Sequence, residues 1–248
     1  RGHGESDHPE TGYDADTLTE DIRQFLDALR IEKVILAGHS MANVELSHFS
    51  ALHPERVLKL IFLDAAYDRS SASFKDMVEN SPWRHIQPPG LDVDYYSAEE
   101  HFAAMKRAYP SFSLIWTEAF EQQSYHEITT APDGKIVDRM SDAVSEALNT
   151  TMRSYALEDS KIKVPALAFF ALSKGLNAIS DEWMTDEQKA ALLQHVETRE
   201  NAWTRESIEL FRRNVPHARI VEIPQGHHYC FIEQEELVYE EMRKFLME

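Results

Sequence analysis

The apolar run Val34–Ala37 leads directly into Gly38-His39-Ser40-Met41-Ala42, and the residues that follow have a helical pattern. The five residues fit a G-x-S-x-G pattern with alanine in the last small position. A turn between a strand and a helix must be tight to expose one serine hydroxyl above a sheet, and small residues leave room for nearby backbone. The segment therefore predicts an α/β fold with Ser40 as a candidate nucleophile. A continuous apolar strand also predicts coverage on both faces, as in a parallel sheet.

A serine at this junction has a second common role, in which it caps the next helix by accepting hydrogen bonds from the first free amides. The other end of the chain favours the first role. Residues 220–223 predict a short strand, Pro224-Gln225-Gly226 ends it, and His227-His228 follow on a loop. A serine hydroxyl becomes nucleophilic when a base removes its proton, and histidine, with a reference pKa of about 6.5, suits that task. Nucleophile early and histidine late is the chain order Ser, acid, His.

Four segments of this chain resemble the α/β-hydrolase family in their order and spacing, and with the core elements around them they cover well over half of the chain. They are residues 1–6, 33–41, 53–64 and 223–236. The resemblance implies a mostly parallel α/β-hydrolase-type sheet flanked by helices. It also implies a core formed by residues 1–68 and 161–248, with residues 69–160 inserted as a helical cap.

The resemblance also assigns the histidine. The family ends its last strand with Pro, a Gly-rich turn, the catalytic His and an aromatic residue. His228 falls on the catalytic position and Tyr229 on the aromatic one. His227, the alternative, falls where the family often has a small residue. In the same way, the amide of Met41, directly after Ser40, is expected to be one donor of the oxyanion hole.

The resemblance assigns the acidic residue less directly than the histidine. In most of the family it follows the strand before the last, here Val164–Ala171, but residues 172–175 (Leu-Ser-Lys-Gly) contain no aspartate. Some relatives, such as haloalkane dehalogenases, place the acid one strand earlier, where Leu60–Leu63 ends in Asp64. Asp64 is therefore the expected partner of the histidine, with Asp68 as the second choice. The alternative role for Asp64 is to bond the amides of the next turn.

The first segment, Arg1-Gly2-His3-Gly4, follows the fourth strand in the family. The resemblance therefore implies that earlier strands, and the loop carrying the second oxyanion donor, lie upstream of Arg1. Loss of one such donor typically lowers the rate by about 10²–10³. A chain lacking it is expected to have weak activity or none.

Helices are predicted at several places outside the turn. Thr17-Leu18-Thr19-Glu20 has the pattern of a capping box, and the apolar residues that follow recur at helical spacing. These are Leu18, Ile22, Phe25 and Leu29. A long helical stretch is predicted from about Thr185 to Arg213. Residues 69–160 are rich in aromatic side chains, most of which are expected to pack against one another.

Composition excludes several function classes. The formal net charge of −18 (25 Lys and Arg against 43 Asp and Glu) argues against nucleic acid and anionic membrane surfaces as partners. There is no apolar run long enough to span a membrane. Cys230, the single cysteine, cannot form an internal disulfide and is expected to pack in the core. No metal or cofactor is indicated. A soluble protein is expected. Its location is left open, with the cytoplasm favoured, and so is its oligomeric state.

Together these observations predict a serine hydrolase acting on a small carboxylic ester or related acyl substrate. Ser40 would attack, His228 would transfer the proton and Asp64 would orient His228. A serine at the nucleophile position argues against the epoxide-hydrolase and dehalogenase branches, which use aspartate there. A cofactor-free perhydrolase or C–C bond hydrolase would use the same residues. A non-catalytic scaffold or binding protein with this fold is the alternative from another class.

Overall fold

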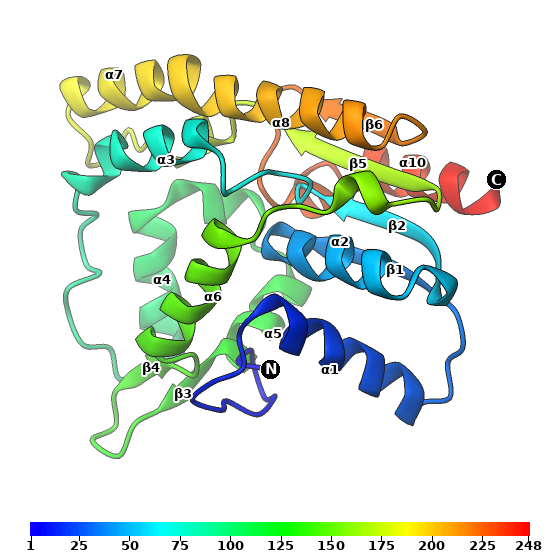
Figure 1. The fold of residues 1–248 in the computed structure, drawn as a ribbon. Helices are drawn as coiled ribbons and strands as arrows, with labels where there is room; N and C mark the ends of the chain where they lie inside the picture. The colour runs from blue at the N-terminus through cyan, green and yellow to red at the C-terminus, as the bar shows by residue number, and fades with distance from the viewer.

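A computed structural model describes residues 1–248 (Figure 1). Its centre is a four-stranded sheet in the order β1-β2-β5-β6, in which all neighbouring strands are parallel. The strands are β1 (Val34–His39), β2 (Val57–Leu63), β5 (Ala166–Ala171) and β6 (Arg219–Ile223). A separate antiparallel pair is formed by β3 (Ile128–Thr130) and β4 (Ile136–Asp138). The predicted α/β class, with a parallel sheet flanked by helices, is confirmed.

The helices fall into two groups along the chain. Those that accompany the sheet are α1 (Ala15–Ala28), α2 (Asn43–Leu52), α7 (Asp186–His195), α8 (Asn201–Asn214), α9 (Cys230–Glu233) and α10 (Glu235–Met247). Those between β2 and β5 are α3 (Ala72–Glu79), α4 (Ala98–Ala108), α5 (Glu118–Glu127) and α6 (Asp142–Ser154). A π-helical turn, Val196–Glu200, joins α7 to α8, so that the two run as one long helical rod in Figure 1. The long helix expected from about residue 185 is therefore present. None of the helices is both long and apolar enough to cross a membrane.

The two faces of the sheet form two separate cores because successive side chains of a strand point in opposite directions. On one face, Phe62 and Phe170 pack with α2 and α8, through residues such as Phe49 and Phe211. On the other face, residues of the strands pack with residues of α9 and α10. The strand residues are Ile61, Leu167, Phe169 and Ile223, and the helix residues are Cys230, Val238 and Phe245. All six residues of β5 are buried, as expected for a central strand covered on both sides.

Strand β1 departs from this expectation. Val34 and Leu36 pack against the larger core, but Ile35 is 38% exposed. The prediction that both faces of β1 are covered is therefore wrong. The physical reason is that β1 lies at an edge of the sheet and contributes no residue to the core that α9 and α10 cover.

The predicted start of the first helix is also wrong. Helix α1 begins at Ala15, and its N-cap is Asp14, whose carboxylate accepts hydrogen bonds from the amide (2.9 Å) and the hydroxyl (2.8 Å) of Thr17. Thr17 therefore lies inside the helix. The helical stripe is only partly buried, since Phe25 is 63% exposed and Leu29 is 55% exposed.

Candidate active site

Ser40 occupies the turn between β1 and α2, where a 3₁₀ turn covers Ser40–Ala42. Its φ is +57°, in the left-handed region that non-glycine residues rarely adopt. The first small residue is required for a steric reason. A Cβ on Gly38 would lie 2.6 Å from the Cβ of Ala42, which is far inside van der Waals contact. The turn is therefore as tight as the sequence predicted.

The hydroxyl of Ser40 does not cap the following helix. The N-cap of α2 is Ala42, which has no side-chain hydrogen bond. Instead the Oγ of Ser40 lies 2.8 Å from Nε2 of His228, a residue 188 positions further along the chain. The capping alternative is thus not what the structure shows.

His228 lies on the loop after β6 and makes a second hydrogen bond with its other ring nitrogen. Nδ1 lies 2.6 Å from Oδ2 of Asp64. With Nδ1–H donating to the carboxylate, Nε2 is left as an acceptor for the serine hydroxyl. His227 faces elsewhere, since its Nδ1 accepts from the amide of Tyr229 at 2.9 Å. The structure thus brings Ser40, His228 and Asp64 together and leaves out His227.

The loop of His228 is held from the side of β1. The ring of His39 lies 4.4 Å from that of His228, between centroids, and its Nε2–H donates to the backbone carbonyl of His228 at 2.9 Å. Burial lowers the pKa of His39 to about 4, so this imidazole is neutral at pH 7. His39 therefore helps to position the loop that carries His228.

Asp64 is completely buried directly after β2, and its φ of +46° is also left-handed. Oδ1 accepts from the hydroxyl of Tyr67 and from the amide of Ala171 (2.8 Å). Oδ2 accepts from His228 and from Nζ of Lys174 (3.1 Å). Burial alone would raise the pKa of Asp64, but the Lys174 charge and these hydrogen bonds hold that pKa well below its usual range. The buried carboxylate is therefore ionised.

Burial raises the pKa of a carboxylic acid but lowers that of an imidazole. It lowers the pKa of His228 below the ordinary value of 6.5, and Asp64 only partly offsets this change. The charges of Lys174 and Arg69 lower the pKa of His228 further. At pH 7 the imidazole is therefore mostly neutral, which is the form that can accept a proton from Ser40.

The other candidate residues lie away from this line of hydrogen bonds. The carboxylate of Asp68, the second choice for the acid, accepts from the amide (2.9 Å) and hydroxyl (2.6 Å) of Ser70, a local turn contact. Cys230 is fully buried in the core under α10, and burial raises the pKa of its thiol to about 12. The packing role predicted for Cys230 is what the structure shows.

Sequence reasoning missed two residues around Asp64. Tyr67 and Lys174 both contact the carboxylate, and Nζ of Lys174 also lies 4.1 Å from the centroid of the Tyr67 ring. Lys174 stands in the loop after β5, where the family usually has its acid. The available signal was the cation itself, because a lysine at a sheet edge beside a buried carboxylate is a natural ion-pair partner.

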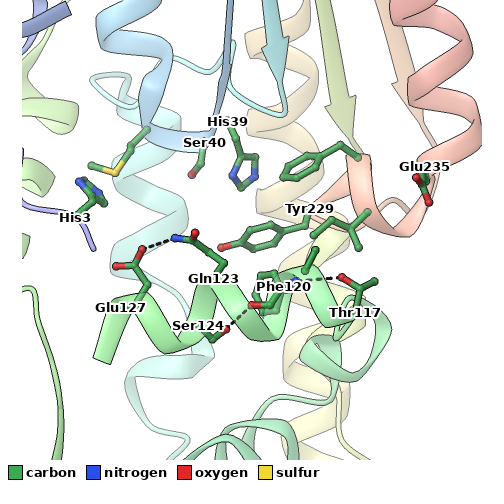
Figure 2. Close-up of a pocket in the computed structure, with 14 residues that line it drawn as sticks. His3, His39, Ser40, Thr117, Phe120, Gln123, Ser124, Glu127, Tyr229 and Glu235 are labelled. Carbon is green, nitrogen blue, oxygen red and sulfur yellow. Dashed lines mark hydrogen bonds between the residues drawn. The ribbon is translucent and has the colours of Figure 1, made fainter. Parts of the chain in front are cut away.

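A cavity of about 900 Å³ opens beside Ser40. In Figure 2, Ser40, His39 and Tyr229 face it from one side, and Phe120, Gln123 and Glu127 face it from α5 on the other. His3 and Glu235 lie toward opposite ends. The remaining lining residues are Met41, Thr117, Ala119, Ser124, Phe231 and Ile232. The cavity gives a small molecule room to reach the serine hydroxyl.

Comparisons with known proteins concern the fold and part of the sequence. Residues 1–113 match the family described as alpha/beta hydrolase fold. The AB hydrolase superfamily protein YisY of Bacillus subtilis (strain 168) is 43% identical over 67 residues, 27% of this chain and 25% of the relative. A non-heme chloroperoxidase of Streptomyces lividans is 38% identical over 66 residues, 26% of this chain and 24% of the relative. The matched segments thus span about a quarter of these curated relatives.

Solved structures match along the whole chain. A marine microorganism esterase aligns with a TM-score of 0.60 at 23% identity, over 99% of this chain and 82% of its own. E-2-(acetamidomethylene)succinate hydrolase aligns with a TM-score of 0.68 at 19% identity, over 100% of this chain and 79% of its own. At such identities the likeness concerns the fold. The chain therefore has the fold of these α/β-hydrolase structures, and its residues 1–113 are similar to the family of that description.

Proposed function

We propose that the protein is a serine hydrolase that cleaves a carboxylic ester or a related acyl substrate through an acyl-enzyme. The observation that carries the proposal is the unbroken line of hydrogen bonds from Ser40 through His228 to Asp64, at 2.8 and 2.6 Å, beside a cavity. A buried, ionised carboxylate on one nitrogen of a neutral imidazole, with a serine on the other, is the arrangement that activates a hydroxyl.

In the first half-reaction, Oγ of Ser40 attacks the substrate carbonyl carbon while its proton moves to Nε2 of His228. The carbonyl oxygen becomes an oxyanion, which faces the amide of Met41 in this proposal. When the intermediate collapses, the bond to the leaving alcohol breaks and His228 returns the proton to that alcohol. Asp64 stays ionised throughout and stabilises the imidazolium that forms between the two proton transfers.

In the second half-reaction, water takes the place of the alcohol. His228 removes a proton from water as the oxygen attacks the acyl carbon, and it then protonates Oγ as Ser40 leaves. The carboxylic acid departs and the site returns to its starting state. Each half-reaction begins with neutral His228, which agrees with the direction in which burial moves its pKa.

We propose the segment from residue 69 to residue 160 as a cap over the site. Helix α5 from this segment forms one wall of the cavity, and the ring of Phe120 lies 5.3 Å from that of Tyr229, between centroids. Many of the cap's aromatic rings contact one another, as those of Phe102 and Trp116 do at 5.3 Å. The cap therefore has a small core of its own and contributes one face to substrate binding.

Perhydrolysis is a second candidate because a non-heme chloroperoxidase is among the relatives. Hydrogen peroxide would replace water as the nucleophile that attacks the acyl-enzyme, and a peracid would leave in place of the acid. The same three residues would serve both reactions. Peracid formation from an ester and hydrogen peroxide, measured beside ester hydrolysis, tests this candidate.

Covalent labelling tests the proposed function directly. A fluorophosphonate probe should label the folded protein, and Ser40→Ala should abolish the label. Ser124→Ala is a matched control, because Ser124 also lines the cavity but donates only to the carbonyl of Phe120 (2.9 Å). Folded full-length protein that takes no label, or a label that survives Ser40→Ala, would favour the non-catalytic scaffold instead.

A further inference from the structure

The ammonium group of Lys174 shares a carboxylate oxygen with the histidine. Its Nζ lies 3.1 Å from Oδ2 of Asp64, the oxygen that also accepts from Nδ1 of His228 at 2.6 Å. The lysine side chain is 17% exposed and the carboxylate is 0% exposed. The ammonium also lies 4.1 Å from the centroid of the Tyr67 ring and 5.5 Å from that of Trp203. Lys174 is therefore a partly buried cation beside two aromatic rings, and differs from a solvated surface lysine.

The backbone around Lys174 is fixed on both sides. Ser173 has a φ of +56°, and its amide donates to Oδ1 of Asn201 at 2.9 Å. The amide of Gly175 donates to Oε1 of Glu200 at 3.0 Å, and a side chain at Gly175 would collide with that carboxylate. Glu200 ends the π-helical turn between α7 and α8, a rare element that often marks functional places. Two neighbouring residues of one helical rod thus hold the lysine in place.

We propose that Lys174 is a positioning residue of the Ser40 site, which keeps Asp64 aligned with His228 and offsets part of its negative charge. This inference rests on the proposed hydrolase function and adds to it a fourth member. An uncompensated buried carboxylate would hold a proton on the imidazole and leave less of it in the basic form. The ammonium opposes this effect, so that the base stays available at lower pH.

Other charged and titratable groups surround the pair of Lys174 and Asp64. They are Tyr67, Arg69 and Glu200, with His39 and His227 beside His228. Arg69 acts on His228 in the same direction as Lys174, but its guanidinium donates to the carbonyl of Ser40 (3.2 Å). Burial raises the pKa of Glu200, whose carboxylate is bound to the loop amide. Lys174 is the one Lys or Arg that forms an ion pair with Asp64.

The test is the pH dependence of kcat/KM for a p-nitrophenyl ester in wild type, Lys174→Met and Lys174→Arg. Without the ammonium, His228 should hold its proton more tightly, and the acid limb of the profile should move to higher pH by about 1 unit. At pH values below that limb the Met variant should lose about tenfold more activity than at pH 8. Lys174→Arg should restore the wild-type limb, because the charge is retained.

Lys189→Met is the matched control, since Lys189 pairs with Asp181 (2.8 Å) at the surface, and its profile should superimpose on wild type. The ring signals of His228, titrated by NMR, give a second readout that needs no turnover. If Lys174→Met does not fold, Lys174→Gln is measured on the same terms. Unchanged limbs and an unchanged His228 titration in the neutral variants would overturn the inference. A full-length wild type without Ser40-dependent activity would instead overturn the proposed function.

Discussion

Replacement of Asp64 by asparagine tests the acidic member of the proposed triad. The carboxylate accepts four hydrogen bonds, from the amide of Ala171, the hydroxyl of Tyr67, Nδ1 of His228 and Nζ of Lys174. An asparagine offers one acceptor oxygen and one donating NH₂ group. If the oxygen keeps the Ala171 amide, the NH₂ faces His228 and favours the wrong tautomer, with Nε2 carrying the proton.

In that tautomer the imidazole cannot accept the proton of Ser40. The corresponding change in a serine-protease triad lowers kcat by about 10⁴-fold, which is about 5 kcal/mol at 1.36 kcal/mol per tenfold. We expect a loss of this order here. Asp64→Asn also leaves Lys174 without its counter-ion, and breaking a buried pair typically costs about 3–5 kcal/mol of stability. Activity is therefore compared only at temperatures where circular dichroism shows the variant to be folded.

Asp68→Asn is the control, because Asp68 bonds only Ser70 through its side chain and lies off the His228 line. The assay is kcat for p-nitrophenyl ester hydrolysis with both variants at the same pH. We expect Asp68→Asn to retain most of the wild-type rate. A folded Asp64→Asn protein that keeps most of its activity, with the loss in Asp68→Asn instead, would refute the reasoning and move the acid role to Asp68.

Three further predictions follow from single contacts. Gly38→Ala should lower the free energy of unfolding by about 1–3 kcal/mol in denaturant melts, because its Cβ would lie 2.6 Å from that of Ala42; an unchanged midpoint would contradict this. Burial raises the pKa of Asp159 from 3.8 to about 6, so its carboxylate destabilises the folded state increasingly as pH rises from about 4 to 6. Asp159→Asn should therefore raise the free energy of unfolding at pH 8 by up to about 3 kcal/mol, but not at pH 4; equal effects at both pH values in denaturant melts would contradict this. The cavity is lined by Glu127 and Glu235 and by no lysine or arginine. An ester whose acyl chain ends in a carboxylate should therefore have a kcat/KM about tenfold or more below that of its neutral analogue. A higher kcat/KM for the charged ester would count against this cavity as the substrate site.

The features that sequence reasoning predicted correctly have local signals. The tight turn at Ser40 is written in five adjacent residues whose sizes are dictated by the turn itself. The parallel sheet follows from continuous apolar strands such as β5, which need cover on both faces. The structure also brings together the three residues chosen for the triad, although their catalytic roles stay a prediction.

The features that were wrong or missed depend on competition or on distant partners. Asp14 and Thr17 are both good capping residues, and only the folded structure shows that Asp14 caps and Thr17 donates to it. The exposed face of Ile35 depends on how far α10 extends across the sheet, which no local pattern encodes. The contact of Lys174 with Asp64 joins residues 110 positions apart, so the lysine is visible in the sequence but its pairing with Asp64 is not.

Strained backbone conformations lie at the same end of the sheet as the candidate active site. Five non-glycine residues have positive φ, and four of them lie within two residues of the carboxyl end of a strand. They are Ser40 after β1, Asp64 after β2, Ser173 after β5 and Gln225 after β6. Each such residue costs of order 1–3 kcal/mol, so the rest of the fold must over-determine them. Two of the four are proposed triad members, and the other two directly precede Lys174 and the Gly226-His227-His228 loop. In a parallel sheet the carboxyl ends of all strands lie at the same end of the sheet, so the four tight turns there direct the four following loops toward one place. This shared geometry explains how an acid after β2 can contact the histidine after β6. Which strand carries the acid matters less than the end of the sheet at which the acid lies.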